Sequence, residues 1–351
     1  MAELHERFRW LRELAPEGRF LNVYMDQNNK CNLKCRMCGF SDPRVDSLTA
    51  YDMPRELYDS IAAQLFPRIV YLSLSLLTEP FMTRDFPDRC DAVREYGVPF
   101  SDIVTNGTLL TPRAIEKLID ARISRLTVSI DGGTKELYEH IRRGARFENV
   151  IRNIALFQSM RRERGAALPR LRIHHVLSDA NIDAFDSFLD LVEELGPEMI
   201  EVRTLADLGQ IELRPHADPK FWSQLPAVRA KLEAFCARTG IEDAGYLRPR
   251  PSVIEILDEA GDPMTCRRPW DTLALHANGD AYICMGWARE PLGNFALQSF
   301  EEIWGGAMMR KVRAEFEEQR PGIDCLNCTI CSDPGPNDLF YRKLAKQPPV
   351  W

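Results

Sequence analysis

The chain has 351 residues, of which 45% are hydrophobic and 28% charged, and its formal net charge at pH 7 is −7. Because it has no run of about 18 apolar residues and begins with a charged amphipathic segment, the sequence excludes a spanning helix and a signal peptide and predicts a cytoplasmic protein. The acidic balance and short basic runs disfavour nucleic-acid binding, since contacts to phosphates require clustered Lys and Arg.

Short apolar runs alternate with amphipathic patterns from residue 19 to residue 204. The apolar runs predict strands at 20–25, 69–76, 100–105, 125–130, 171–177 and 199–204. The patterns between them predict helices at 54–66, 113–121, 147–160 and 184–196, the last of which ends at a Gly196 cap. Such alternation is typical of strand–helix units around a parallel sheet. It predicts an α/β fold built as a partial barrel, and an open doubly wound sheet would show the same pattern.

Composition also divides the chain into segments. We expect an N-terminal helix at 1–18, the barrel at 19–215, a linker helix and bridge at 216–260, a small cysteine-rich domain at 261–335 and a tail at 336–351. The cysteine-rich domain has little helical periodicity before 299–319. Because a segment rich in Gly, Pro and Asp buries little apolar surface, we expect bound metal to stabilise it.

The ten cysteines are unevenly distributed. Eight of them form two groups, which are Cys31, Cys35 and Cys38, and then Cys266, Cys284, Cys325, Cys328 and Cys331. Thiols stay reduced in the cytoplasm, so metal binding or catalysis is a better interpretation than disulfides.

The first group follows the first predicted strand, and in a parallel barrel the loops after the strands form the functional face. Three thiolates at these spacings lie within reach of one cubane iron–sulfur cluster and leave one iron open to a ligand. Structural zinc is the alternative. It needs four ligands, and no His lies between His5 and His140 to supply a fourth nearby.

The spacing C-x3-C-x2-C after the first strand resembles the signature of the radical S-adenosylmethionine (SAM) superfamily. The resemblance implies a partial (β/α)6 TIM-like barrel and a SAM-binding [4Fe–4S] cluster on Cys31, Cys35 and Cys38. It also implies that a flavodoxin- or ferredoxin-type donor supplies an electron, and that SAM yields a 5′-deoxyadenosyl radical that abstracts a hydrogen atom from the substrate. The protein then places the reactants while the cofactor supplies the reactivity.

Further motifs occur in the order found in that superfamily. "TEP" with Glu79 resembles the motif that receives the methionine amino group of SAM, with Leu77 and Thr78 in place of its glycines. Asn106 in "TNGTLL" is similar to a residue near the cofactor. Arg142 in "IRRGARF" is similar to one that takes the SAM carboxylate through a forked hydrogen bond.

By the same resemblance, Ser129 and Asp131 in "SIDGG" contact SAM, and Met37 packs on its adenine. Each position has a plainer alternative. Ser129 and Asp131 would cap the next helix, and Met37 would be ordinary loop packing. In the same way, Arg142 would be a surface arginine and Glu79 a solvated loop acid.

The second group begins with the spacing C-x12-G-x4-C, in which "ANGDAY" predicts a hairpin turn around Gly279. With the later "CLNCTIC", it resembles the SPASM/twitch domain of many radical SAM enzymes. That resemblance implies one auxiliary [4Fe–4S] cluster, held by Cys266, Cys284, Cys325 and Cys328 with Cys331 as an alternative ligand. A zinc ribbon is the competing interpretation.

The predicted activity is that of a radical SAM oxidoreductase. We expect dehydrogenation, epimerisation or rearrangement of a small polar metabolite of the sugar, aminocyclitol or nucleoside type. Only about 18 residues precede the first strand, which is too short for a leader-binding domain, so a peptide- or protein-modifying maturase is the alternative. A non-catalytic iron–sulfur electron-transfer protein is a more remote one.

Five residues are weak candidates for the chemistry on the substrate. Cys90 and Cys236 would donate a hydrogen atom to a substrate radical, although both lie in amphipathic helical patterns where Cys usually packs in the core. His174, His175 and Arg203 lie near the ends of the last two predicted strands, where they would face a substrate or be hydrogen-bonded within the protein.

Overall fold

The structure is a computed structural model that describes residues 18–205, 219–244, 247, 268–284 and 290–318. None of the helices in these ranges combines the length and the apolar character that crossing a bilayer requires. The predicted N-terminal helix and C-terminal tail lie outside the described residues.

The centre of the molecule is a parallel sheet. Its six main strands are β1 Leu21–Met25, β2 Ile69–Ser73, β3 Phe100–Thr105, β4 Arg125–Ser129, β5 Arg170–Leu177 and β6 Met199–Thr204. Each pairs in parallel with its neighbour in chain order. A doubly wound sheet reverses its strand order at a switch point, whereas this order runs in one direction. The sheet therefore confirms the partial TIM-like barrel.

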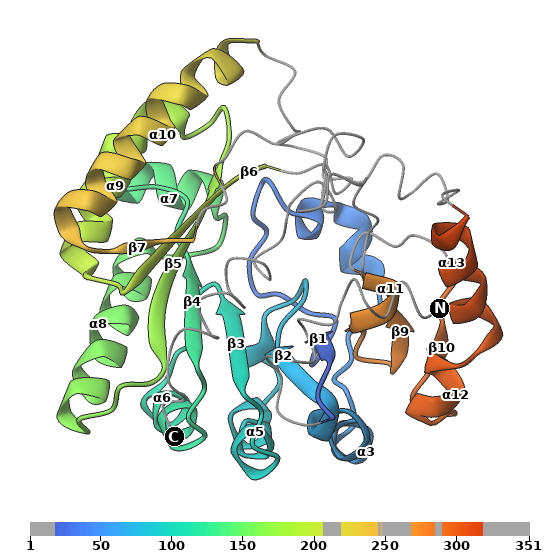
Figure 1. The fold of residues 1–351 in the computed structure, drawn as a ribbon. Helices are drawn as coiled ribbons and strands as arrows, with labels where there is room; N and C mark the ends of the chain where they lie inside the picture. Colours follow the sequence, from blue (N-terminus) through green and yellow to red (C-terminus); the bar gives the residue numbers. More distant parts are fainter. Residues whose placement is uncertain (1–17, 206–218, 245–246, 248–267, 285–289, 319–351) are drawn as a thin grey trace.

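Helices connect the strands along the outer side of the sheet. They are α3 Arg55–Leu65, α4 Phe86–Arg89, α5 Asp91–Glu95, α6 Pro112–Asp120, α7 Lys135–Ile141, α8 Phe147–Glu163 and α9 Phe185–Leu195, followed by α10 Pro219–Thr239. The helices α8 and α9 cover the outer side of β5 and β6, and α10 lies beside α9 (Figure 1). The predicted cap of α9 is confirmed, since Gly196 has φ of 56°, a left-handed conformation that glycine adopts readily.

The two faces of the sheet differ in chemistry. In β5, Leu171 and Ile173 are fully buried, and the alternation of a strand places Arg172 and His174 on the opposite face. The apolar set packs against the outer helices. We call the opposite face, which carries charged side chains on β3 to β6, the inner face.

The C-terminal part adds strands to the edge of this sheet at β1 (Figure 1). After α11 Arg268–Asp271, β8 Thr272–Leu275 pairs in parallel with β1. The next strands are β9 Asp280–Tyr282 and β10 Gly293–Asn294, which pair antiparallel with β8 and β9 respectively. At the other edge, β7 Glu242–Asp243 pairs with β6. The β8–β9 hairpin confirms the predicted turn, in which Gly279 has φ of 91°.

Two helices follow β10. The helical pattern predicted for 299–319 is divided at Gly305 into α12 Phe300–Trp304 and α13 Ala307–Glu317. Phe300 and Trp304 of α12 pack on Phe20, just before β1, with ring centroids 6.5 and 5.8 Å away. This contact fixes the C-terminal helices next to the first strand of the barrel.

Candidate functional site

The loop that carries the first three cysteines follows β1 and is tied to two other loops. The backbone N–H groups of Lys34 and Arg36 donate to the carbonyls of Arg143 and Ile141, each at 2.9 Å. The N–H of Glu79 donates to the carbonyl of Lys30 at 2.9 Å. The segments after β2 and β4 are therefore held against the cysteine loop, at the carboxyl ends of the strands.

The three thiols lie close enough to influence one another. Burial raises the pKa of Cys31 to about 11 and that of Cys35 to about 12, and the neighbouring thiols add to both shifts, while the Arg142 cation opposes them. Thiolates at these buried positions therefore need a positive partner such as a metal centre. Among the described residues, no group of three His, Cys, Asp or Glu side chains could hold a single metal ion. In a cubane cluster, by contrast, each thiolate binds a different iron atom. The thiols fit such a cluster.

Glu79 is 2% exposed, which overturns its interpretation as a solvated loop acid. Its Oε1 accepts a hydrogen bond from the Thr105 hydroxyl, and its Oε2 accepts one from the Asn106 N–H, both at 2.8 Å. Burial nevertheless raises the pKa of Glu79 to about 7. A cationic amino group brought next to this carboxyl would favour its ionised form.

Asn106, at the end of β3, connects that strand to the cysteine loop. Its Nδ2 donates to the Asn32 Oδ1 at 2.9 Å and lies 3.9 Å from the Cys31 Sγ. Its Oδ1 accepts from the Thr108 N–H at 2.9 Å. The amide is thus oriented by its own loop and directed at the first cysteine.

Asp131 and Arg142 form a buried ion pair of 2.7 Å. Arg142 is 7% exposed, so it is not a surface arginine. The hydroxyl of Thr134 caps α7 by accepting from the Leu137 N–H, so neither Ser129 nor Asp131 fills that role.

The Nε of Arg142 is buried and has no hydrogen-bond partner among the described residues. An unpartnered cationic donor beside the cysteine loop fits an anionic group such as the SAM carboxylate. Ser129 and Asp131 lie at and just beyond the end of β4. Met37 is half-buried and packs against the core, which fits both its proposed role and plain loop packing.

Asp26, directly after β1, was not identified from the sequence. It is 4% exposed, and its carboxylate accepts from the N–H groups of Leu76 and Leu77 at 3.0 Å and from the Thr78 hydroxyl at 2.8 Å. It therefore holds the segment that leads into Glu79. The sequence feature that could have identified Asp26 is an acidic residue directly after an apolar strand.

The structure places three of the weak catalytic candidates away from this site. Cys90 is fully buried among the outer helices, where its thiol lies 3.5 Å from the Phe86 carbonyl. Cys236 lies in α10. His175 lies on the outer side of β5, stacked on Phe188 of α9 with ring centroids 3.9 Å apart. These positions favour the plainer alternatives, which are core packing for Cys90 and Cys236 and a hydrogen bond within the protein for His175, whose Nδ1 lies 2.8 Å from the Ile130 carbonyl oxygen.

His174 and Arg203 do lie on the inner face, where both are near Glu201. In the second cysteine group, the structure describes Cys284, which is 7% exposed and follows β9. The other predicted ligands, Cys266, Cys325, Cys328 and Cys331, lie outside the described residues.

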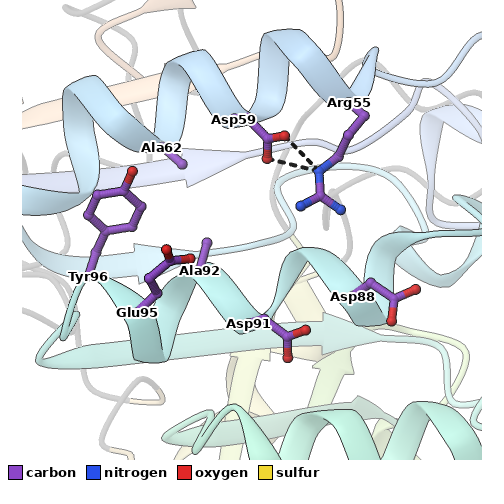
Figure 2. A pocket seen from close by; sticks show the side chains of 8 residues that line it. All are labelled: Arg55, Asp59, Ala62, Asp88, Asp91, Ala92, Glu95 and Tyr96. Carbon is purple, nitrogen blue, oxygen red and sulfur yellow. Dashed lines mark hydrogen bonds and ion pairs between the residues drawn. The ribbon is translucent and has the colours of Figure 1, made fainter.

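A hollow of about 350 Å³ lies on the outside of the barrel, between α3 and the α4–α5 segment (Figure 2). Its acidic lining is largely paired: Arg55 contacts Asp59 at 2.8 Å, and Lys117 of α6 contacts Asp91 at 2.8 Å. Such surface ion pairs contribute little to stability individually. Nothing in the hollow belongs to the cysteine loop or to the inner face.

Family models match both parts of the chain. The model described as "Radical SAM superfamily" matches residues 28–192, and the SPASM model, described as "Iron-sulfur cluster-binding domain", matches residues 266–331. These matches confirm the predicted cofactors, SAM and iron–sulfur clusters, and overturn both zinc alternatives. They also set aside the non-catalytic electron-transfer protein, since this is a family of enzymes.

Among curated proteins, the AdoMet-dependent heme synthase of Methanosarcina barkeri is 27% identical over 303 residues, which cover 81% of this chain and 82% of that protein. A probable GTP 3′,8-cyclase of Metallosphaera sedula is 24% identical over 247 residues, covering 67% of this chain and 72% of that protein.

Two solved structures share the fold at 16% identity. The structure of Streptococcus suis SuiB bound to the precursor peptide SuiA has a TM-score of 0.66. The match covers 94% of this chain and 74% of the SuiB chain. The structure of native anSMEcpe with bound AdoMet has a TM-score of 0.64, and the match covers 93% of this chain and 95% of the anSMEcpe chain. The chain therefore belongs to the radical SAM superfamily and carries an iron–sulfur cluster-binding SPASM domain.

Proposed function

We propose that this radical SAM enzyme abstracts a hydrogen atom from a small polar metabolite, leading to dehydrogenation, epimerisation or rearrangement. The observation that carries the proposal is that the cysteine loop, Glu79, Asn106 and the Asp131–Arg142 pair meet at the carboxyl ends of parallel strands. A non-catalytic iron–sulfur protein would not need a buried acid and a buried cation directed at its cluster loop.

In this proposal, Cys31, Cys35 and Cys38 hold the cluster and leave one iron to SAM. Glu79 receives the amino group of SAM, and Arg142 receives its carboxylate. Asp131 is a positioning residue, because its ion pair fixes the Arg142 guanidinium. Held by these residues, the cluster and SAM would supply one-electron radical chemistry for hydrogen-atom abstraction.

The small-metabolite substrate is favoured by the curated relatives. Their printed names refer to haem synthesis and to the cyclisation of GTP. Another relative, from Pyrococcus furiosus, is a "cofactor-modifying protein" for a tungsten-containing oxidoreductase. These matches reach 23–27% identity over 61–81% of this chain.

A peptide- or protein-modifying maturase is the second candidate. It is favoured by the titles of the fold neighbours, which include SuiB with its precursor peptide and anSMEcpe with a bound peptide. Their identity to this chain is 16%. Deuterium transfer into 5′-deoxyadenosine from a labelled metabolite supports the first candidate, and transfer from a labelled polypeptide supports the second.

We further propose that the barrel spans 19–215, the linker 216–260 and the SPASM domain 261–335. One auxiliary cluster is held there by Cys266, Cys284, Cys325 and Cys328, with Cys331 as the alternative ligand. A flavodoxin- or ferredoxin-type protein is the proposed electron donor. Iron content of about eight per chain after anaerobic reconstitution would support two [4Fe–4S] clusters.

The test of the proposed function is anaerobic SAM cleavage. Reconstituted enzyme with dithionite should form 5′-deoxyadenosine, and Arg142→Gln should lower the rate by about tenfold or more because a charge-assisted bond to SAM is lost. Arg164→Gln is the matched control, since Arg164 pairs with Glu116 and Asp120 on the outer surface. An absence of cleavage by enzyme with full cluster content would overturn the proposal.

A further inference from the structure

Tyr138 of α7 has a buried hydroxyl group to which the site described above gives no role. The residue is fully buried, and its ring packs on Phe147 with the ring centroids 5.5 Å apart. The hydroxyl itself is buried as well, yet it has no hydrogen-bond partner among the described residues. Because a buried polar group without a partner is costly, such a hydroxyl indicates an acceptor that the polypeptide does not supply.

The helix that carries Tyr138 is attached to the cysteine loop. The carbonyl of Tyr138 accepts from the Arg142 N–H at 2.7 Å. One turn further along α7, the carbonyl of Ile141 accepts from the Arg36 N–H, which lies directly after Cys35, at 2.9 Å. Tyr138 therefore lies one helical turn before the contact between α7 and the loop of the first three cysteines.

Electrostatic effects show that Tyr138 and Cys35 lie around the same guanidinium group. Burial raises the pKa of Cys35 to about 12 and also raises the pKa of Tyr138, and the Arg142 cation opposes both shifts. A thiolate at Cys35 would add to the shift at Tyr138. The phenol, the thiol and the guanidinium thus share one buried region beside the cysteine loop.

The backbone around Tyr138 leaves it little room to move. A Cβ on Gly132 would lie 2.6 Å from the Tyr138 backbone nitrogen, so the loop after β4 packs directly on this turn of α7. The Tyr138 N–H donates to the Thr134 carbonyl at 2.9 Å. The fold therefore sets the position of the phenol before any cofactor binds.

The charged neighbours of the hydroxyl are engaged with other groups. Asp131 accepts from the Val176 N–H at 2.8 Å through its Oδ1 and contacts Arg142 at 2.7 Å through its Oδ2. The Tyr138 hydroxyl makes no hydrogen bond to it. Arg142 has only donor groups. Sulfur is the remaining acceptor in this region, from Cys35 and from the sulfide ions that a bound iron–sulfur cluster adds.

We propose that Tyr138 tunes the SAM-binding cluster, because its hydroxyl donates a hydrogen bond to a sulfur atom of the cluster beside Cys35. Hydrogen bonds to the sulfurs are one of the factors that set the reduction potential of such a cluster. Reduction makes the cluster more negative, so the bond is stronger in the reduced state and raises the potential. This inference rests on the proposed function, since it takes Cys35 as a ligand of that cluster.

The experiment is a redox titration of reconstituted holoenzyme without SAM, followed by electron paramagnetic resonance. The signal of the SAM-binding cluster is the one that Cys35→Ala lacks. Tyr138→Phe keeps the ring and removes only the hydroxyl. It should lower the equilibrium constant for one-electron reduction of this cluster about threefold to tenfold, which makes the potential more negative by about 30–60 mV.

Tyr58→Phe is the matched control. Tyr58 of α3 is also fully buried, but its hydroxyl donates to the Arg89 carbonyl at 2.8 Å, among the outer helices. This variant should leave the potential of the SAM-binding cluster unchanged. Replacement of Tyr138 with 3-fluorotyrosine keeps the test valid if Tyr138→Phe fails to fold. Fluorine makes the phenol a stronger donor, so here the potential should rise.

An unchanged potential in Tyr138→Phe with full iron content, an equal shift in Tyr58→Phe, or no rise with 3-fluorotyrosine overturns the inference. Because the titration uses neither SAM nor a substrate, its outcome is independent of SAM cleavage. An enzyme whose potential shifts as expected but which never forms 5′-deoxyadenosine would contradict the proposed function alone.

Discussion

At the residue scale, Cys35 and Cys90 are both buried thiols with different expected roles. Cys35 is 8% exposed in the loop after β1, and Cys90 is fully buried between α4 and α5. Replacing Cys35 with Ala should remove the SAM-binding cluster, because two remaining thiolates are too few to hold it. The measurements are iron content and 5′-deoxyadenosine formation after anaerobic reconstitution.

Cys90→Ala is the control for that variant. It should keep the full iron content and lose only the packing of one sulfur atom in the core. Loss of iron in Cys90→Ala, or retention of SAM cleavage in Cys35→Ala, would contradict the assignment of the ligands.

A second prediction at this scale concerns His174. Burial lowers the pKa of His174 from 6.5 to about 4, so as the pH falls the unfolded chain takes up this proton before the folded chain does. His174 therefore costs no stability above about pH 6.5, and below it the free energy of unfolding falls by up to about 1.4 kcal/mol per pH unit. Anaerobic urea unfolding between pH 7.5 and about pH 5.5 should show this loss.

His174→Gln has no titrating group at this position, so its stability should fall less over the same pH range. Parallel pH curves for wild type and variant would show that His174 already takes up its proton in the folded protein.

The sequence indicated Glu79 and Arg142 because each lies in a short motif at a strand end. Their partners could not be identified in this way. Asp26 accepts hydrogen bonds from the backbone N–H groups of Leu76 and Leu77. Because nearly every residue type has a backbone N–H, the residue types at these positions do not reveal such a contact. The side of the sheet on which His175 lies could have been read from the sequence, because the alternation of Leu171 and Ile173 with polar residues assigns it to the outer side of β5.

At the element scale, the loop between β4 and α7 depends on close backbone contacts. A Cβ on Gly133 would lie 2.1 Å from the carbonyl carbon of Ser187 in α9. Gly133→Ala should therefore push α9 away from the loop that carries Asp131 and lower the free energy of unfolding by about 1–3 kcal/mol or more. Denaturant unfolding and the SAM dissociation constant measure the two effects.

Gly39→Ala is the comparison, since a Cβ there meets no atom within 4 Å. It should change stability by no more than about 0.5 kcal/mol. Similar effects for the two variants would mean that the packing of α9 on this loop is less tight than the structure indicates.

The main elements of the barrel followed from periodicity, because each strand is a compact apolar run and each helix has one apolar face. Periodicity did not reveal the break between α12 and α13. At that point a Cβ on Gly306 would lie 2.7 Å from the Glu302 carbonyl oxygen, a contact that only the folded backbone defines.

At the scale of the whole molecule, β8 covers an edge of the barrel sheet. Asn22 to Met25 of β1 pair with Thr272 to Leu275 of β8. A chain truncated after Leu247 would expose the β1 edge, and exposed edges promote association between chains. We expect this truncated chain to be largely insoluble or oligomeric, as measured by size-exclusion chromatography. A monomeric truncated chain with protected β1 amides would contradict this expectation.

The pairing of β8 with β1 could not be read from the sequence, because it joins residues about 250 positions apart and neither strand encodes its partner. The composition of the C-terminal part indicated a separate small domain. In the structure, its first strand is continuous with the barrel sheet.

This shared edge has a consequence for recombination between members of the superfamily. The C-terminal module is not structurally independent of the barrel. Its first strand, β8, pairs along the edge of β1, the strand that leads into the cysteine loop. A chimera that exchanges this module should keep its native cofactor environment only when the two paired strand segments, 22–25 and 272–275, come from the same parent protein.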